Sequence, residues 1–303
     1  MPSSTSIVAN GEYAGKDLIS VIDHHPVKIL GMAVAKKYNG QLPLLVKFID
    51  AEKDLSIQVH PNDEMAQRMH GKMGKSEMWY IIDAKPGSYL YAGFKEHLTP
   101  EKYRAMVNNG SICNVLAKHE VKAGDVFYLP AGRVHAICGG ILLAEVQQSS
   151  DVTYRIFDYN RPGMDGKPRE LHTELAAQAL DFEVQEDYRT HYADSDNTAN
   201  QVIASPYFSV RVTELDSPFH RNLIKYDSFI ITMCIEGDCK IRIRETGDEV
   251  RLNAGNSCLI PAVIADYDII PLTGKSRILD AFIDNKDRSL GNRVTRFLHI
   301  TKK

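Results

Sequence analysis

The 303-residue sequence predicts a mainly β protein of two barrels, with a small helical insertion in the first barrel. Three observations support this prediction. Short apolar segments recur along the chain between turns rich in Gly, Pro and Asp, which is typical of an all-β barrel or sandwich. The spacing of several residues in the first half returns in the second half. A helical pattern replaces the β pattern between about residues 95 and 120.

The first half begins with a helix expected over Lys16–Leu30, interrupted near Pro26, and continues with strands. The expected strands are Leu44–Ile49, Leu55–His60, Met78–Ile82, Tyr89–Phe94, Val126–Leu129 and Ile137–Val146. Between the second and third strands, Asn62 can cap a short helix that Gly71 ends, over Asp63–His70.

The helical insertion is expected to hold two short helices. Thr99 can cap the first, with Pro100 in its first turn, and Ser111 begins the second. A third helix is expected over Thr173–Leu180. A polar linker over about 185–200 follows, and its composition marks it as the most mobile segment. We therefore expect a first domain over 1–200 and a second over 201–303.

The second half repeats spacings of the first. The corresponding positions are Trp79 and Gly87 with Phe229 and Gly237, and Gly124 and Pro130 with Gly255 and Pro261. In this alignment Glu77 corresponds to Asp227, and His135 corresponds to Asp266. The second domain is therefore expected to be another barrel.

The bulk composition excludes several classes of partner. Lys and Arg number 36 against 39 Asp and Glu, and no basic tract stands out, so neither nucleic acid nor a membrane surface is indicated. Five cysteines without a Cys-x-x-Cys motif argue against a disulfide framework and for a reducing compartment. Without an apolar signal core in the sequence, we expect a cytoplasmic protein, either a monomer or a homodimer.

Candidate metal ligands lie between Ser56 and Tyr80. Gln58 and His60 are two residues apart, so a strand places their side chains on one face. Pro61 ends that strand, and the chain returns so that Glu77 begins the next one. An imidazole, an amide oxygen and a carboxylate are thereby offered to one point, with positions left for water or substrate. Such a ligand set is typical of a catalytic zinc site.

A second motif supplies a fourth ligand. The segment from Gly124 to His135 reads Gly-x5-Pro-x-Gly-x2-His, which resembles the second signature motif of the cupin barrels. Pro130 and Gly132 shape the turn, and His135 then starts the return strand. Four residue types at fixed offsets are far more specific than any one of them.

Taken together, the motifs resemble those of the type I mannose-6-phosphate isomerases, in their short bacterial form. The matching segments are Ser56–Pro61, Lys75–Tyr80, Gly132–His135 and Ser150–Arg155, and the resemblance extends from about Val8 to the C-terminus. These enzymes are zinc-dependent cupin proteins. The resemblance implies one Zn²⁺ per chain and an aldose–ketose isomerisation of mannose 6-phosphate and fructose 6-phosphate through an enediolate. It also implies four metal ligands, which are Gln58, His60, Glu77 and His135.

The resemblance also implies which side chains act on the substrate. Matching positions line the family's site at Lys75, Glu145, Asp151 and Arg155, and Ser56 matches a phosphate contact. Strand alternation agrees for three of them, since Lys75 lies two residues before Glu77, Ser56 lies two before Gln58, and Glu145 shares a face with Gln147. Arg155 can stabilise an oxyanion or hold phosphate. Which carboxylate is the catalytic base stays open.

The second barrel offers Asp227 and Asp266 but no imidazole at the corresponding positions, so we expect it to be metal-free and to support the first. Two other functions remain open. One is another metal-dependent cupin isomerase or epimerase of sugar phosphates, because one barrel chemistry serves several substrates. The other is a non-catalytic sugar-binding cupin, which would not require an open metal position.

Overall fold

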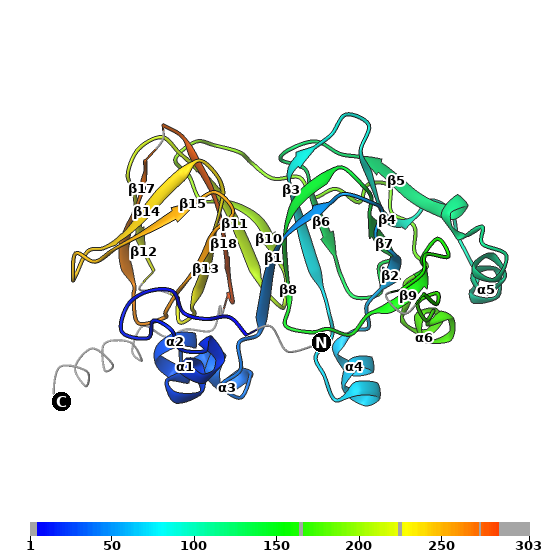
Figure 1. Ribbon diagram of the computed structural model, residues 1–303, viewed down its shortest axis with the longest axis horizontal. Helices are drawn as coiled ribbons and strands as arrows, with labels where there is room; N and C mark the ends of the chain where they lie inside the picture. The colour runs from blue at the N-terminus through cyan, green and yellow to red at the C-terminus, as the bar shows by residue number, and fades with distance from the viewer. Residues whose placement is uncertain (1–4, 164–165, 224–225, 273, 285–303) are drawn as a thin grey trace. The chain divides into compact units, whose positions relative to one another are not determined.

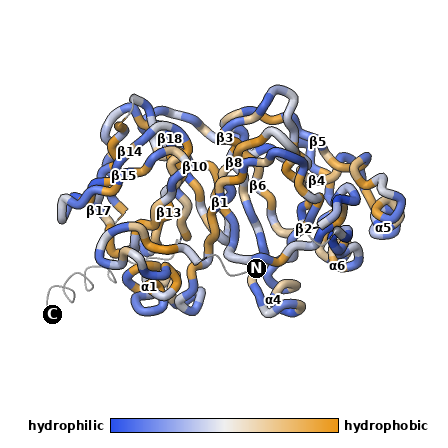
Figure 2. Tube along the Cα trace, viewed as in Figure 1, coloured by the Kyte–Doolittle hydropathy of each residue, from blue (hydrophilic) through white to orange (hydrophobic). Residues whose placement is uncertain are grey.

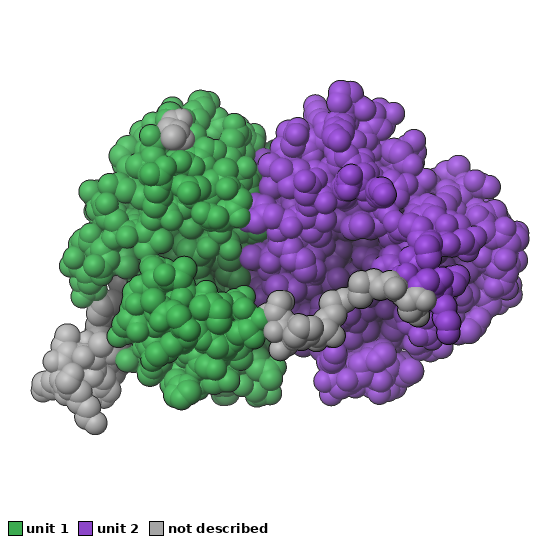
Figure 3. Space-filling view, in the orientation of Figure 1, with its two compact units in different colours: residues 1–43, 192–303 green, residues 44–191 purple. Residues whose placement is uncertain are grey.

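The computed structural model describes residues 5–163, 166–223, 226–272 and 274–284 (Figure 1). The chain divides into two compact units, coloured separately in Figure 3. Unit 1 comprises Met1–Pro43 and Tyr192–Lys303, and unit 2 comprises Leu44–His191. The expected second domain extends to residue 303, so its end lies outside the described residues.

Unit 2 contains two open antiparallel sheets that share a core. One sheet has the order β1-β8-β3-β6, with bounds Leu44–Ala51, Ile141–Gln148, Glu77–Ala84 and Val126–Leu129. The other has the order β5-β4-β7-β2-β9, with bounds Leu116–Glu120, Tyr89–Phe94, His135–Ile137, Ile57–Val59 and Tyr154–Phe157. Trp79 and Phe127 from the first sheet pack in one buried cluster with Leu90 and Ile137 from the second.

Helices cover the outer face of the second sheet. Helix α5 (Pro100–Asn108), the 3-10 helix η1 (Ile112–Val115) and helix α6 (Thr173–Ala179) contribute to a buried cluster with residues of β2 and β9. Since Ile57 and Val59 face this cluster, the residue between them, Gln58, faces the inner side of the sheet. Alternation in β2 thus separates an apolar outer face from a polar inner one.

Several elements form where local signals predict them. Helix α4 covers Asp63–His70, since Asn62 accepts a hydrogen bond from the backbone of Met65 and Gly71 adopts the left-handed conformation at the end. Strands β4 and β6 also have the expected bounds. Helix α5 and η1 lie between β4 and β5, in the expected helical range.

Other expectations were wrong. The segment Ile137–Val146 is not one strand, because a turn at Gly139 and Gly140 separates β7 from β8. Strands β5 and β9 and helix α3 (Met32–Lys37) were not expected, whereas the interruption near Pro26 is confirmed, because α1 (Leu18–His24) and α2 (Pro26–Leu30) meet there. The mainly β class is confirmed, whereas the two barrels and the helical insertion stay predictions.

Unit 1 repeats the strand order of unit 2. One sheet has the order β10-β11-β18-β13-β16, with bounds Asn200–Ala204, Ser209–Leu215, Ser276–Phe282, Ile230–Glu236 and Ser257–Ile260. The other has the order β12-β17-β14-β15, with bounds Phe219–Asn222, Asp266–Pro271, Asp238–Ile243 and Glu249–Asn253. Counted by position in the chain, β13, β16, β17 and β18 correspond to β3, β6, β7 and β8.

Strand register corrects one part of the repeat. Glu77 pairs with Leu129, directly before Pro130. In unit 1, Ile260 directly precedes Pro261 and pairs with Ile230. The residue in the position of Glu77 is therefore Ile230, not Asp227, because pairing rather than linear spacing sets the correspondence.

Asp227 has a different role, at the N-terminus of α3. Its two carboxylate oxygens accept hydrogen bonds from the backbone of Met32 at 3.0 Å and of Ala33 at 2.9 Å. The backbone of Phe229 also donates to Leu30. These contacts place the first 43 residues in unit 1, whereas the sequence assigned them to the first domain.

Figure 2 shows apolar and polar residues alternating along many of the strands. The alternation agrees with sheets that have one face in a core. Within the described residues, none of the helices is both long and apolar enough to cross a membrane.

Candidate metal centre and active site

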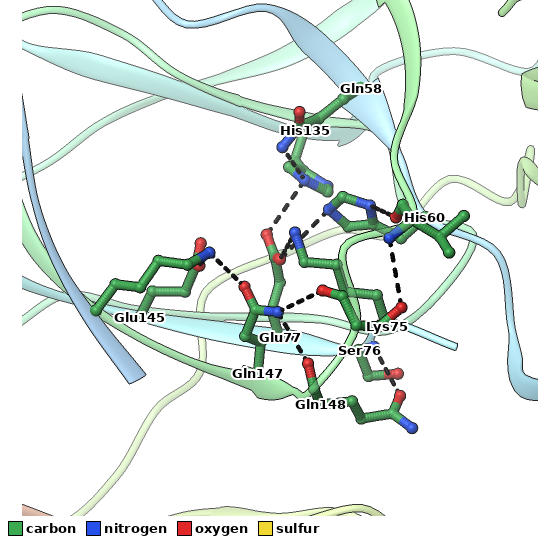
Figure 4. A network of polar contacts seen from close by, with 12 residues as sticks. Gln58, His60, Lys75, Ser76, Glu77, His135, Glu145, Gln147 and Gln148 are labelled. Atoms are coloured by element: carbon green, nitrogen blue, oxygen red, sulfur yellow. Dashed lines mark hydrogen bonds and ion pairs between the residues drawn. The ribbon is translucent and has the colours of Figure 1, made fainter. Parts of the chain in front are cut away.

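Three strands bring the expected ligands together. His135 is the first residue of β7 and Glu77 is the first residue of β3, while Gln58 lies in the middle of β2. Gln58 and His135 are paired in the β2–β7 register, so both side chains point to the inner side. His60 follows β2 by one residue and lies on the same side (Figure 4).

The imidazoles of His60 and His135 converge on the carboxylate of Glu77. His60 Nε2 lies 3.3 Å from Glu77 Oε2, and His135 Nε2 lies 3.2 Å from Oε1. The candidate ligand atoms all lie within 4.8 Å of one another. All three side chains are buried. Gln58 Nε2 lies 3.3 Å from His135 Nε2, so rotating the amide by half a turn would turn its oxygen toward the same point.

Both imidazoles are oriented by backbone carbonyls. His60 Nδ1 donates to the carbonyl of Val152 at 2.9 Å, and His135 Nδ1 donates to the carbonyl of Arg133 at 2.8 Å. A carbonyl only accepts, so in each neutral ring the proton is on Nδ1 and the lone pair is on Nε2. Each lone pair therefore faces Glu77, which is the arrangement that metal-binding histidines use.

Protonation of the three groups favours cation binding. Burial lowers the pKa of His60 to about 4 and also lowers the pKa of His135. Burial alone would raise the pKa of Glu77, but the Lys75 ammonium and the two imidazoles outweigh it and hold this pKa well below its usual range. The site thus presents two neutral imidazoles and one carboxylate at neutral pH.

The buried polar atoms fit a metal ion. His60 Nε2 and both oxygens of Glu77 make no well-formed hydrogen bond within the described residues. Buried polar atoms without partners cost free energy, and a cation between them would remove that cost. Two imidazoles, a carboxylate and an amide oxygen are nitrogen and oxygen donors of the kind that zinc accepts. The residues therefore fit a divalent metal ion.

Lys75 lies against these groups, and Ser56 lies next to the strand that carries Gln58. The Lys75 ammonium is buried and 3.3 Å from Glu77 Oε2. Its backbone donates to Pro61, which connects the segment before β3 to the end of β2. Ser56 is buried directly before β2. Lys75 precedes β3, and its ammonium reaches Glu77 from the segment before that strand.

Glu145 is buried on β8, and both of its oxygens are engaged. Lys47 Nζ lies 2.7 Å from Oε1, and Trp79 Nε1 donates to Oε2 at 2.9 Å. Lys47 also donates to the side-chain oxygen of Gln147 at 2.6 Å. The roles of Lys47, Trp79 and Gln147 were not expected from the sequence. The available signal was that Lys47 is the only charge in the apolar segment Leu44–Ile49.

The structure does not bring Asp151 to the ligands. Its carboxylate side chain is 76% exposed and pairs with Lys72 at 2.6 Å. Asp151 therefore does not orient Arg155. The neighbouring Val152 serves the site through its backbone, as the carbonyl that accepts from His60.

Arg155 faces the inner side with the ligands. It pairs with Gln58 in the β2–β9 register, so Arg155, Gln58 and His135 form one row across three strands. Its Nη1 donates to the carbonyl of Glu170 at 3.0 Å, while its buried Nε has no hydrogen-bond partner in the part of the chain that the structure describes. A permanent positive charge is thereby placed beside the metal site.

Two further arginines lie close to Arg155. Arg161 and Arg169 both pair with Asp158 at 2.6 Å. Burial alone would raise the pKa of Asp158, but these hydrogen bonds lower it. Arg161, Arg169 and the carboxylates of Asp158 and Glu170 all act electrostatically on Arg155, so three guanidinium groups stand with two carboxylates here.

Comparisons with known proteins identify the family that the chain resembles. Residues 1–87 match the family described as phosphomannose isomerase type I, catalytic domain, and residues 197–281 match mannose-6-phosphate isomerase, cupin domain. The chain is 37% identical to the mannose-6-phosphate isomerase ManA of Bacillus subtilis over 87% of this chain and 82% of that protein. It is 31% identical to the mannose-6-phosphate isomerase of Streptococcus mutans over 88% and 81%.

The chain also matches solved structures of mannose-6-phosphate isomerases. The crystal structure of the mannose 6-phosphate isomerase from Bacillus subtilis has a TM-score of 0.81 and 31% identity, and the match covers 92% of this chain and 86% of that one. A variant of the phosphomannose isomerase from Salmonella typhimurium has a TM-score of 0.72 at 18% identity, over 92% and 88% of the two chains. The second likeness shows the fold alone.

Proposed function

Because the chain belongs to the type I phosphomannose isomerase family, we propose that it is a zinc-dependent enzyme that interconverts mannose 6-phosphate and fructose 6-phosphate. The observation that carries the proposal is the convergence of His60 and His135 on the buried carboxylate of Glu77. We propose these three residues and Gln58 as the ligands of one zinc ion per chain.

The reaction transfers a proton between C1 and C2 of the sugar and passes through an enediolate. Bound zinc would supply Lewis-acid stabilisation of the negative charge that develops on the two substrate oxygens. Arg155, in the same row as Gln58 and His135, adds a fixed positive charge toward that region. The ammonium of Lys75 is placed to exchange a proton with a substrate hydroxyl, since it lies on the inner side beside Glu77.

Glu145 is the carboxylate that we propose as the base at carbon. It is buried, and its two contacts keep the carboxylate in one orientation. Asp151 is less suited to this role because its side chain is exposed and paired with Lys72. Ser56, Arg155 and the neighbouring Arg161 are proposed to hold the substrate phosphate, for which guanidinium groups offer paired donors.

The proposal is tested by incubating the purified protein with each sugar phosphate, before and after exhaustive chelation. Activity should be lost with the metal and return with Zn²⁺. His60→Ala and His135→Ala should each bind zinc much more weakly, because each removes one ligand of the set. Elemental analysis of the same samples is the second measurement. Full turnover in protein verified as metal-free would contradict the proposed role of zinc.

A further inference from the structure

We propose that Tyr188 is a positioning residue for His135, acting through Arg133 and Gly93 from a segment that the sequence marks as a mobile linker. The inference rests on the proposed function, because it concerns the orientation of a proposed metal ligand. Tyr188 does not touch the ligands, and its proposed effect passes through the turn that leads into β7.

The ring of Tyr188 is part of the core of unit 2. The residue is 5% exposed and packs in the buried cluster that contains Trp79 and Phe127. A Cβ added to Gly93 would lie 2.1 Å from the Tyr188 ring, so the ring lies directly against the backbone of β4. Gly93 has a φ of +80°, which side chains rarely adopt, so glycine is required here for both reasons.

Hydrogen bonds hold Tyr188 in this place. Its hydroxyl donates to the carbonyl of Phe94 at 2.9 Å and accepts from the backbone of Gln185 at 3.1 Å. Two residues further on, the backbone of Thr190 donates to Val126 of β6 at 2.8 Å. The segment 185–190 is therefore attached to two strands, although its composition is that of a mobile linker.

Two contacts lead from Tyr188 to His135. The guanidinium of Arg133 lies 4.9 Å from the centroid of the Tyr188 ring, and Arg133 Nη1 donates to the carbonyl of Tyr128. The carbonyl of Arg133 accepts from His135 Nδ1 at 2.8 Å. On the other side, the backbone of Gly93, which the ring covers, donates to the carbonyl of Val134 at 2.8 Å. Both residues that precede His135 are thus held by groups in contact with Tyr188.

The physical consequence concerns the tautomer of His135. The lone pair of His135 is on Nε2, facing Glu77, only while Nδ1 carries the proton and donates it to the Arg133 carbonyl. Removing the ring would leave a cavity beside Gly93 and free the Arg133 side chain, so the peptide between Arg133 and Val134 would gain freedom to move. The carbonyl would then orient the imidazole less strictly, and metal affinity would fall without loss of any ligand.

The test compares Tyr188→Leu with Tyr103→Leu. Tyr103 is the matched control because it is also a buried tyrosine of unit 2, but it packs in the cluster under α5 and α6 on the outer face of the sheet. Two quantities are measured on folded protein. The tautomer of His135 is read in the metal-free protein from its imidazole nitrogen chemical shifts. Zinc affinity is measured by competition with a chelator.

We expect Tyr188→Leu to mix the two tautomers and to weaken zinc binding by about tenfold, the lower end of effects seen when groups behind metal ligands are removed. Tyr103→Leu should change neither quantity. Tyr188→Phe keeps the ring against Gly93 and Arg133 but loses the hydroxyl, and it should change both quantities much less than Tyr188→Leu. Unchanged tautomer and affinity in Tyr188→Leu, or equal losses in Tyr103→Leu, would overturn the inference.

A second variant covers the case in which Tyr188→Leu does not fold. Arg133→Met removes the guanidinium that stacks on the ring while it leaves the backbone carbonyl in place. It should weaken zinc binding severalfold, and affinity equal to that of the wild type would overturn the inference. If the wild-type protein binds no zinc, the proposed function fails, whereas the tautomer measurement on metal-free protein still decides the role of Tyr188.

Discussion

Trp79 donates its indole proton to Oε2 of Glu145 at 2.9 Å, and the same indole ring meets the imidazole of His135 edge to face, with centroids 5.3 Å apart. One side chain of β3 therefore contacts both a proposed metal ligand and the proposed base. Because Lys47 takes the other oxygen of Glu145, both oxygens of this carboxylate are held by neighbouring side chains.

The first prediction concerns the base. Glu145→Gln keeps the shape of the side chain but cannot accept a proton, so kcat should fall by about 10²–10⁴. Exchange of the carbon-bound hydrogen of the substrate with solvent should fall in parallel, and metal content should stay unchanged. Asp151→Asn is the comparison. Because the side chain of Asp151 is exposed, this substitution should lower kcat much less. If Asp151→Asn abolishes exchange and Glu145→Gln does not, the assignment is reversed.

The second prediction concerns Arg155. If its charge acts on the enediolate, Arg155→Ala should lower kcat by roughly 10²–10³, as loss of one oxyanion donor does in other enzymes. If it grips phosphate, KM should rise while kcat stays near the wild-type value. Arg155→Lys should rescue the phosphate role better, because phosphate accepts a point charge. Metal content is measured on the same samples. Near-normal kcat and KM in Arg155→Ala would remove this residue from the site.

The third prediction concerns the stability of the metal-free protein at low pH. The pKa of His60 falls from 6.5 to about 4 on folding because the ring is buried. Below pH 6.5 the unfolded chain therefore binds a proton that the folded chain does not, and stability should decrease as the pH falls toward 4. Above pH 6.5 the imidazole of His60 is neutral in both states, so it does not lower the free energy of unfolding. At pH 4 this free energy should be lower by roughly 3 kcal/mol.

The measurement for this prediction is denaturant unfolding of the metal-free protein between pH 4 and pH 7. His60→Asn removes the buried imidazole and should flatten the dependence in this range. His97→Asn is the control, because His97 is exposed and its replacement should leave the slope as it is. An identical slope in wild type and His60→Asn would show that His60 does not contribute.

The fourth prediction concerns unit 1. Asp227 caps the N-terminus of α3, so Asp227→Ala should lower the free energy of unfolding by about 1 kcal/mol. Turnover and metal content should not change, since Ile230 occupies the position of Glu77 in the repeat. Asp266 pairs with His220 at 2.5 Å on the surface, and Asp266→Ala should also leave turnover unchanged. Two equally tight metal ions per chain would contradict this account.

Local signals in the sequence were sufficient for several elements and for the shared face of two proposed ligands. Helix α4 follows from Asn62 and Gly71, and β4 and β6 follow from apolar segments bounded by turn residues. Alternation in β2 predicts that Gln58 and His60 share a face. In each case residues adjacent in the chain determine the backbone conformation, so the information is available without the rest of the fold.

Contacts between distant segments decided the rest. Lys47 is far from Glu145 along the chain, and Asp227 is far from Met32. No periodic pattern of the sequence relates such distant residues, and only sheet pairing or helix docking brings them together. Strand β5, with the polar segment Leu116–Glu120, forms because β4 supplies its hydrogen bonds. Tyr188 lies in a polar segment but packs in the core, because Gly93 leaves room for its ring. The sequence determined which side chains were available, and tertiary packing determined which of them hold the others in place, because burial and pairing depend on residues that no local window contains.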